Sequence, residues 1–273
     1  MQAFEAIAFN CIRQYRLNED VLLAGDGAEA VHQARVALRR LRSALKLFKP
    51  MLKGKKRDVF MAELGWLAGL LGQVRDLDVI MALTSDTALQ AQLKHHRQAA
   101  YADLLLALHT HRCRALFLDL SEWLVAGGWR QRKAGAKLRA MSARAFAGSA
   151  LDKWMGRVLV DDQRIDQLDD AARHAVRKSA KVLRYGVEFF ALLFDEKGER
   201  KPRIRFLSYL EDVQDHLGEL NDMAARQEML VQWGLDGSMP GQDDGADEAR
   251  RQALLRRATD SAQLLRNADP YWR

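Results

Sequence analysis

The chain has 273 residues, of which 43 are Lys or Arg and 36 are Asp or Glu, and its formal net charge is +7. A hydrophobic content of 48% with 29% charged residues is typical of a soluble globular protein and excludes an intrinsically disordered chain. The two cysteines, Cys11 and Cys113, have no spacing that indicates a disulfide framework or a cysteine zinc site. Because the sequence shows no signal peptide and no apolar run near the ~18 residues of a membrane span, we expect a cytoplasmic protein.

Charge is distributed unevenly along the chain. Residues 1–150 contain 23 basic and 13 acidic side chains, whereas residues 151–273 contain 20 basic and 23 acidic ones. Between Ala30 and Arg57 there are ten Lys or Arg residues and no Asp or Glu. Since so many cations on one segment repel one another, this stretch indicates an anionic partner.

The periodicity of apolar residues predicts an all-α protein. In chain order, the helix-like segments are 27–49, 56–72, 87–125, 167–194, 203–219 and 246–267. Val, Ile and Thr, which favour strands, number only 23 in total. The glycine pair 127–128 and the Gly- and Asp-rich stretch 234–247 are interpreted as loops.

Two motifs recur in the same order and indicate an internal duplication. The pattern H-x-x-R-x-x-x-[RK]-x-L-R begins at His32 and again 142 residues later at His174, and LGQVRD at 71–76 is followed 146 residues later by LGELND. We therefore expect one domain over 1–273, made of two pseudo-symmetric four-helix-bundle halves, 1–130 and 150–273. If a two-fold axis relates the halves, the repeated basic helices would line one central groove.

Each copy of the first motif places a row of cations on one helix face. At about 100° per residue, the basic residues of the first copy share one stripe, while Leu38, Leu41 and Leu45 belong to a separate apolar stripe. The second row is shorter, because Glu188 stands at the position equivalent to Lys46. Arginine binds phosphate oxygens through two parallel hydrogen bonds, so the rows predict an extended and densely anionic ligand. The predicted contacts are His32, Arg35, Arg39, Arg40, Arg42, Lys46, His174, Arg177, Lys178, Lys181 and Arg184, with Arg112 and Arg114 as additional anion contacts.

A solvated helix face paired to neighbouring acids is the alternative interpretation of these rows. Acids available for such pairing are Asp76, Asp78, Asp166, Asp169, Asp170 and Asp222. We expect Asp76 and Asp78 to cap a helix or to hold an arginine of the first row, rather than to bind a metal. The pairs His95–His96 and His109–His111 lack a carboxylate at metal-ligand spacing. No phosphate-binding glycine loop or nucleophile motif is present, so we expect neither a catalytic site nor a cofactor.

At these residues the sequence resembles a CHAD domain, the conserved histidine α-helical domain. The resemblance rests on VHQARVALRRLRSALKLF, LAGLLGQVRDLDV, KSAKVLRYGVEFF and HLGELND, and it covers essentially the whole chain. It implies a helical bundle of two similar halves around a basic groove that binds inorganic polyphosphate, in some members at polyphosphate granules. The residues it assigns to binding are His32, Arg35, Arg39, Arg40, Arg42, Lys46, His174, Arg177, Lys181 and Arg184.

Many members of this family carry a CYTH triphosphatase domain before the CHAD domain. Its E-x-E-x-K signature is missing here, so the chain is expected to be a stand-alone CHAD protein or the C-terminal module of a larger one. Implied partners are polyphosphate, granule-associated proteins and a fused or separate CYTH-type triphosphatase, without a membrane. Two departures, Val182 in place of a second basic residue and the acidic stretch Val160-Asp161-Asp162, suggest weaker binding by the second half.

Three other functions fit parts of the sequence. Basic helices and a pI of about 9.5 also suit nucleic-acid binding, although no recognition motif is present. A phosphohydrolase would use Asp76, Asp78 and His32 with a metal ion. A scaffold that recruits a partner protein to granules is compatible with polyphosphate binding.

Overall fold

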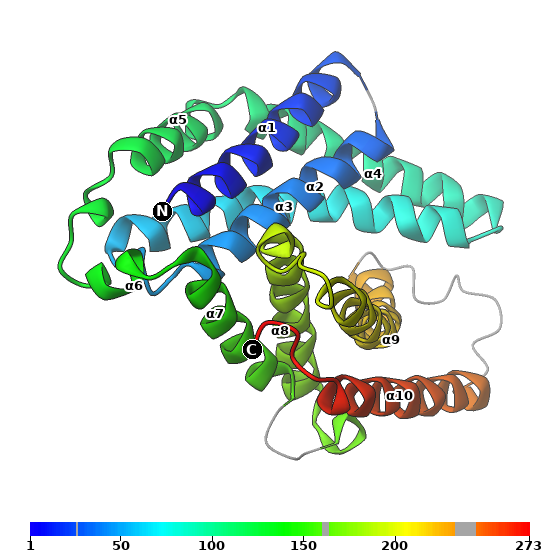
Figure 1. Ribbon diagram of the computed structural model, residues 1–273. Coiled ribbons are helices and arrows are strands. Elements are labelled where there is room, and N and C mark those ends of the chain that lie inside the picture. Colours follow the sequence, from blue (N-terminus) through cyan, green and yellow to red (C-terminus); the bar gives the residue numbers. More distant parts are fainter. Residues whose placement is uncertain (26, 160–163, 233–243) are drawn as a thin grey trace. The chain divides into compact units, whose positions relative to one another are not determined.

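Helices make up the regular structure of the computed structural model, which describes residues 1–25, 27–159, 164–232 and 244–273 (Figure 1). These residues contain no strand, so the predicted all-α fold is confirmed. Val160-Asp161-Asp162 and most of the expected loop 234–247 lie outside the described residues. In the described part of the chain, no helix combines the length and the apolar character that crossing a membrane requires.

Two compact units divide the chain, Met1–Met141 and Ser142–Arg273. In the N-terminal unit, α1 packs on α2, α2 on α3 and α3 on α4, and α5 covers α1 and α3 (Figure 1). The helices of this unit are α1 (Gln2–Ala24), α2 (Ala28–Leu47), α3 (Lys55–Leu83), α4 (Thr87–His109), α5 (His111–Ala126), the 3₁₀ turn η1 (Gly128–Arg130) and α6 (Ala136–Ala140).

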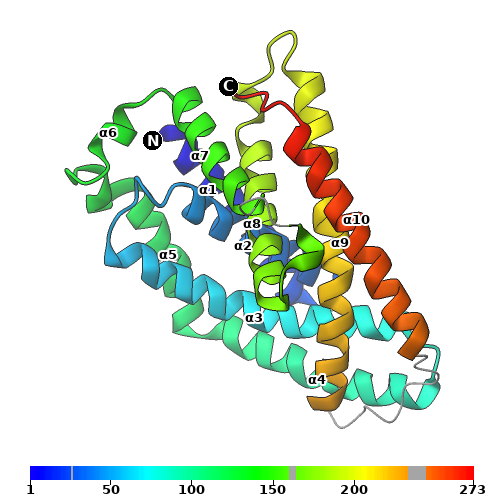
Figure 2. The ribbon, with the colours of Figure 1, turned by 90° about the horizontal axis from the view of Figure 1, so that it is seen from below.

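The C-terminal unit repeats this order of packing with four long helices. Here α7 packs on α8, α8 on α9 and α9 on α10, and the last two run side by side in Figure 2. Its elements are α7 (Ala143–Val158), η2 (Ile165–Gln167), α8 (Asp170–Phe189), η3 (Ala191–Leu193), α9 (Arg200–Gln232) and α10 (Asp244–Asn267). The helices α2 and α8, which carry the two copies of the basic motif, are each 20 residues long.

Apolar burial holds α2 in place despite its charge. Val31, Leu38, Leu41 and Leu45 have no exposed surface and face the core of the N-terminal unit. A fully buried leucine contributes about 1.5–3 kcal/mol, whereas a pair of like charges one turn apart costs roughly 0.2–0.5 kcal/mol. The apolar stripe therefore outweighs the repulsion along the basic stripe, and the helix forms without a counter-ion.

The segment 87–125, expected as one periodic stretch, consists of two helices. The chain leaves α4 at Thr110, whose backbone is extended and whose hydroxyl accepts a hydrogen bond from the backbone N–H of Cys113. Threonine thus acts as the N-cap of α5, a signal that periodicity by itself does not detect because Leu104, Leu108 and Leu116 keep a helical spacing across the break.

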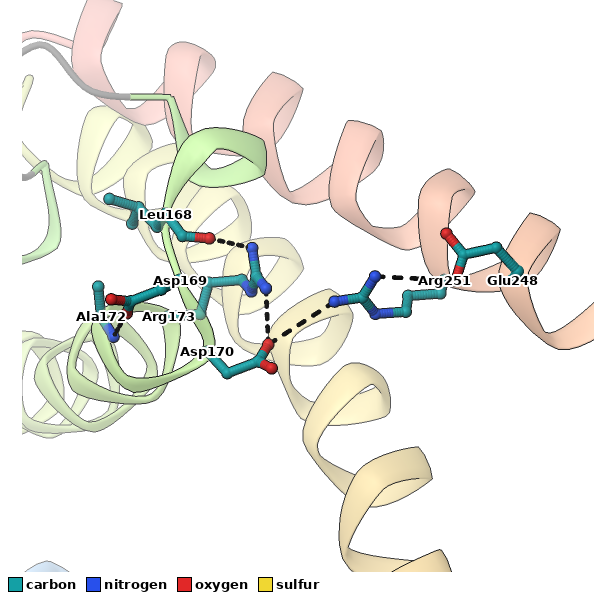
Figure 3. A network of polar contacts seen from close by, with 7 residues as sticks. All are labelled: Leu168, Asp169, Asp170, Ala172, Arg173, Glu248 and Arg251. Atoms are coloured by element: carbon teal, nitrogen blue, oxygen red, sulfur yellow. Dashed lines mark hydrogen bonds and ion pairs between the residues drawn. The ribbon is translucent and has the colours of Figure 1, made fainter.

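A polar network fixes the start of α8 (Figure 3). Asp169 caps the helix by accepting a hydrogen bond of 2.7 Å from the backbone N–H of Ala172. Asp170 pairs with Arg173 at 2.6 Å and lies 3.8 Å from Arg251 of α10. These contacts tie the first turn of the basic helix to the neighbouring α10, and they assign structural roles to two acids that the sequence offered as partners of the basic rows.

Candidate anion-binding site

Five basic residues of α2, which we name the α2 ladder, line the side of the helix next to α3: His32, Arg35, Arg39, Arg42 and Lys46. All five are half-buried. A Cβ built on Gly72 of α3 would lie 3.5 Å from Nε of Arg35, and one built on Gly65 would lie 3.4 Å from Nη2 of Arg42. Arg42 follows Arg35 by seven residues in α2, and Gly65 precedes Gly72 by seven residues in α3, so the two helices are antiparallel. Both guanidinium groups lie over the backbone of a glycine.

Arg35 and Arg42 have neither an acidic nor a hydrogen-bonding partner among the residues that the structure describes. The Nε atoms of both are buried. Burial and the nearby charge of Arg35 lower the pKa of Arg42 from its usual value. A buried donor without a partner is costly, and more so when it carries charge, so this pair is poised for an anion.

His32, at the start of the ladder, is surrounded mainly by cations. Burial, followed by the charge of Arg75, lowers its pKa, and Arg39 and Arg35 act in the same direction against Glu29. The imidazole is therefore neutral at pH 7 and can donate one hydrogen bond. Arg39 and Lys46, further along the ladder, take part in additional polar or electrostatic contacts.

The corresponding residues of α8, which we name the α8 ladder, are His174, Arg177, Lys181 and Arg184. Acidic and amide side chains of α9 face this ladder. Nη2 of Arg177 lies 3.5 Å from Asp222, and Nδ1 of His174 lies 3.0 Å from Oδ1 of Asn221. The solvated-face interpretation, with arginines paired to acids of a neighbouring helix, thus describes much of the α8 ladder.

Arg184 shows the difference between the two ladders most clearly. Its Nη1 donates a 3.3 Å hydrogen bond to Glu211, and its Nε lies 3.7 Å from Glu188. Burial acts against the charged form, but Glu188, Tyr185 and Glu211 outweigh it, and the pKa of Arg184 is raised. At the matching position of α2, the pKa of Arg42 is lowered. Arg184 therefore has acidic partners, whereas Arg42 has none in the part of the chain that the structure describes, although the Nε atoms of both are buried without a hydrogen bond.

A cavity of about 260 Å³ lies between α8 and α9 at the start of the α8 ladder. Its polar lining combines the cations Arg173 and Arg177 with the acid Asp170 and the amide of Asn221. The complete lining is Asp170, Arg173, His174, Arg177, Leu217, Leu220, Asn221 and Ala224. Part of the α8 ladder is thus accessible, but its charge is partly neutralised.

Two predicted contacts, Arg40 and Lys178, lie outside the main rows of the ladders. Arg40 turns toward α1, where its charge acts to lower the pKa of the Cys11 thiol, although burial outweighs this effect and raises that pKa to about 11. Its counterpart Val182 is buried in the core of the C-terminal unit, so the valine removes no cation from the α8 ladder. Lys178 is exposed at the edge of the α8 ladder, one helical turn from His174 and from Lys181.

Arg112 and Arg114 of α5, expected as additional anion contacts, are engaged elsewhere. Arg112 forms two hydrogen bonds with Glu63, of 2.6 and 3.0 Å, and stacks 3.8 Å above the ring centre of Trp66. Arg114 donates a hydrogen bond to the backbone carbonyl of His109. Both arginines therefore stabilise the packing of α5 and have fewer donors for a ligand.

Asp78, two residues after the first LGxxxD motif, and Asp222, the last residue of the second, have different partners. Asp78 forms a 2.6 Å ion pair with Arg97 of α4, in which both side chains are nearly buried, so its role is structural. Asp222 pairs with Arg177 as described above. Among the residues with described positions, no three His, Cys, Asp or Glu side chains gather as a metal site.

Sequence reasoning missed the part of the site that α3 supplies. Gly65 and Gly72 make room for the guanidinium groups, and Arg75 adds charge beside His32. The signal was present: Gly65, Gly69 and Gly72 recur at intervals of four and three, which places them on one face of the helix. That spacing can be read only after α3 is known to face the basic stripe.

Comparisons with known proteins give one family. The CHAD domain profile matches residues 6–231. A crystal structure of the CHAD domain from the plant Ricinus communis is similar at 29% identity and a TM-score of 0.71, covering 98% of this chain and 88% of that one. PptA from Streptomyces chartreusis shares the fold at 18% identity and a TM-score of 0.56, covering 97% of this chain and 93% of its own. No curated protein matches. The chain belongs to the CHAD domain family.

Proposed function

We propose that this protein binds inorganic polyphosphate without catalysing its turnover, and that the α2 ladder supplies most of the binding free energy. The observation that carries the proposal is the half-buried pair Arg35 and Arg42, which lie over glycines without an anionic partner in the described chain. An anion that reaches both would satisfy donors whose burial is otherwise costly.

The geometry of the ladder favours a long ligand with repeating charges. From residue 32 to residue 46 the helix rises by about 21 Å, at ~1.5 Å per residue. A single phosphate would satisfy one or two side chains, whereas a linear polyanion can contact the ladder along its length. Polyphosphate carries charge on every unit of a narrow chain, which suits a strip that one helix face provides.

The α8 ladder is proposed as a weaker contributor. Glu211, Asp222 and Glu188 compensate its arginines, and an anion that binds there must displace or approach these carboxylates. The weaker binding expected of the second half would then result from the acids of α9 and from Glu188, which compensate the arginines of the α8 ladder. Granule association and cooperation with a CYTH-type triphosphatase would follow from polyphosphate binding and are part of the same proposal.

Calorimetric titration with long-chain polyphosphate tests the proposal, with DNA of equal charge as the comparison and two salt concentrations. Arg35→Gln/Arg42→Gln should weaken polyphosphate binding at least tenfold, because about 1.5–3 kcal/mol is lost for each charged hydrogen bond. The matched variant Arg177→Gln/Arg184→Gln should weaken it less. Binding should fall steeply with salt, as counter-ion release requires.

Three results would overturn the proposal. Unchanged affinity in Arg35→Gln/Arg42→Gln would remove the α2 ladder from the site. Equal or tighter binding of DNA would assign the basic helices to nucleic acid. Release of phosphate from polyphosphate by the purified protein, abolished by Asp76→Ala, would make the protein an enzyme.

A further inference from the structure

A second basic region of the N-terminal unit belongs to neither ladder. It is a cavity of about 220 Å³ where the chain enters α3 and where α5 ends. Ligand pockets for drug-sized molecules measure ~300–1,000 Å³, so this cavity suits a more compact molecule. Its lining is Leu52, Lys53, Gly54, Lys56, Arg57, Glu122, Trp123, Ala126, Gly127, Gly128, Trp129 and Arg132.

Cations dominate the polar lining. Four basic side chains, Lys53, Lys56, Arg57 and Arg132, share this small space with one carboxylate, that of Glu122. Arg57 is itself only 8% exposed. It pairs with Asp58, whose side chain is 68% exposed at the edge of the same turn, so the cavity keeps an excess of positive charge.

The position of these cations is unfavourable for the free protein. The amino end of a helix carries a partial positive charge, and cations there are normally avoided. Here Lys53 precedes α3, Lys56 and Arg57 lie in its first turn, and the N-cap Gly54 provides no side-chain acceptor for the backbone N–H groups. Like charges thus converge where the helix itself attracts an anion.

Arg132 is brought to this end of α3 by a specific contact. Its Nη1 donates a 3.1 Å hydrogen bond to the backbone carbonyl of Lys53. φ at Gly54 is +148°, a backbone conformation that favours glycine, and a Cβ at this residue would lie 2.5 Å from the same nitrogen and displace the guanidinium. The fold therefore holds the guanidinium of Arg132 next to the positive end of α3, whose first turn contains one acid, Asp58, that pairs with Arg57.

We propose that this cavity binds a compact phosphate anion, orthophosphate or pyrophosphate, independently of the polyphosphate site on α2. The lysines and Arg132 would contact the phosphate oxygens, Arg57 would stay paired with Asp58 in the cavity wall, and the first-turn N–H groups of α3 would face the anion. The buried indoles of Trp123 and Trp129 form the rigid apolar floor that limits the size of the ligand.

Titration of the full chain with sodium pyrophosphate tests this assignment. Lys53→Gln/Lys56→Gln should weaken binding at least tenfold, whereas the control Lys55→Gln/Lys133→Gln, which removes the same charge from exposed residues outside the lining, should change it less than twofold. Thermal melting provides a second measurement. In phosphate-free buffer the cavity variant should melt at or above the wild-type temperature, and it should lose the increase that pyrophosphate gives the wild type.

The outcomes separate this site from the polyphosphate site. Equal weakening in the cavity and control variants would reduce the effect to net charge and overturn the proposal. So would loss of pyrophosphate binding in Arg35→Gln/Arg42→Gln with binding retained in the cavity variant, because the anion would then bind on α2. Absence of binding by the wild type at millimolar pyrophosphate would also overturn it, whatever the affinity for long-chain polyphosphate.

Discussion

The guanidinium of Arg42 lies against Gly65, so close that a Cβ on this glycine would stand 3.4 Å from Nη2. In the C-terminal unit the position 142 residues after Arg42 is Arg184, and the position 146 residues after Gly65 is Glu211. Arg184 and Glu211 form a 3.3 Å hydrogen bond. Glu211 on the facing helix, together with Glu188 one turn along α8, thus gives Arg184 acidic partners, whereas Arg42 has none among the described residues.

Gly65→Glu should give Arg42 an acidic partner on α3, as Glu211 of α9 gives one to Arg184. The introduced carboxylate would pair with Arg42, after a shift of a few tenths of an ångström by the flexible guanidinium, and would repel a polyanion. We expect at least a tenfold loss of polyphosphate affinity in calorimetric titration. Helix content should be retained, since glutamate favours helix over glycine by roughly 0.5–1 kcal/mol.

Gly69→Ala is the control for the preceding variant. A Cβ at Gly69 meets nothing within 4 Å, so alanine adds helix propensity without touching an arginine. Its free energy of unfolding should rise by about 0.5–1 kcal/mol, and its polyphosphate affinity should stay within twofold of the wild type. A large loss of affinity in Gly69→Ala would mean that the α3 face is sensitive to volume and not to charge.

Removing acidic partners from the α8 ladder should strengthen the binding of polyphosphate to it. Glu211→Ala/Asp222→Ala removes two carboxylates that face Arg184 and Arg177 and that are 43% and 64% exposed. Polyphosphate affinity should increase severalfold, and the salt dependence should steepen because more cations are available for the ligand. Unchanged affinity and salt slope would show that the C-terminal unit takes no part in binding.

Binding should be linked to proton uptake at His32. Its pKa is lowered in the free protein by burial and by Arg75, Arg39 and Arg35, and a bound polyanion would offset these cations and raise it. Protons are then taken up between the free and the bound pKa, so affinity should increase as the pH falls through that window. Calorimetry in buffers of different ionisation enthalpy measures the uptake, and His32→Gln should reduce it.

Function and stability should respond differently to substitutions in α2. Arg35→Gln/Arg42→Gln removes two half-buried charges that have no acidic partner in the described chain, so its melting temperature should equal or exceed that of the wild type. Leu38→Ala, on the fully buried stripe of the same helix, should lower the free energy of unfolding by about 2–5 kcal/mol. Strong destabilisation of the arginine variant would mean that these side chains support the fold and are not reserved for a ligand.

Glu19 provides a pH-dependent prediction unrelated to the ladders. This carboxyl is 2% exposed beside Tyr15 and Arg16, and burial raises its pKa above 4.5. The folded state therefore holds the proton more tightly than the unfolded state, and stability falls as the pH rises from about 4.5 through the raised pKa. Glu19→Gln should melt above the wild type at pH 8, and the difference should shrink toward pH 4.

Several features of the fold could be predicted from single-helix patterns. The scarcity of strand-forming residues predicts an all-α protein, and the apolar spacing of the two basic segments predicts the helices α2 and α8. Both predictions depend only on local sequence, and both are confirmed. The break at Thr110 was missed because apolar spacing continues across it. The sequence shows that Arg40 is a cation of the basic motif, but it does not show which helix this cation faces. Its proximity to Cys11 depends on how α1 packs against α2.

The sequence by itself determined that this is a helical protein with two similar rows of cations, because helix formation and the direction of a side chain around a helix are local properties. Only the tertiary structure decided which cations have partners on the facing helix. Arg184 meets Glu211 across 27 residues of sequence, and Arg42 meets Gly65 on the opposing helix. Electrostatic compensation depends on distances of a few ångströms between helices, and packing of the whole unit sets those distances.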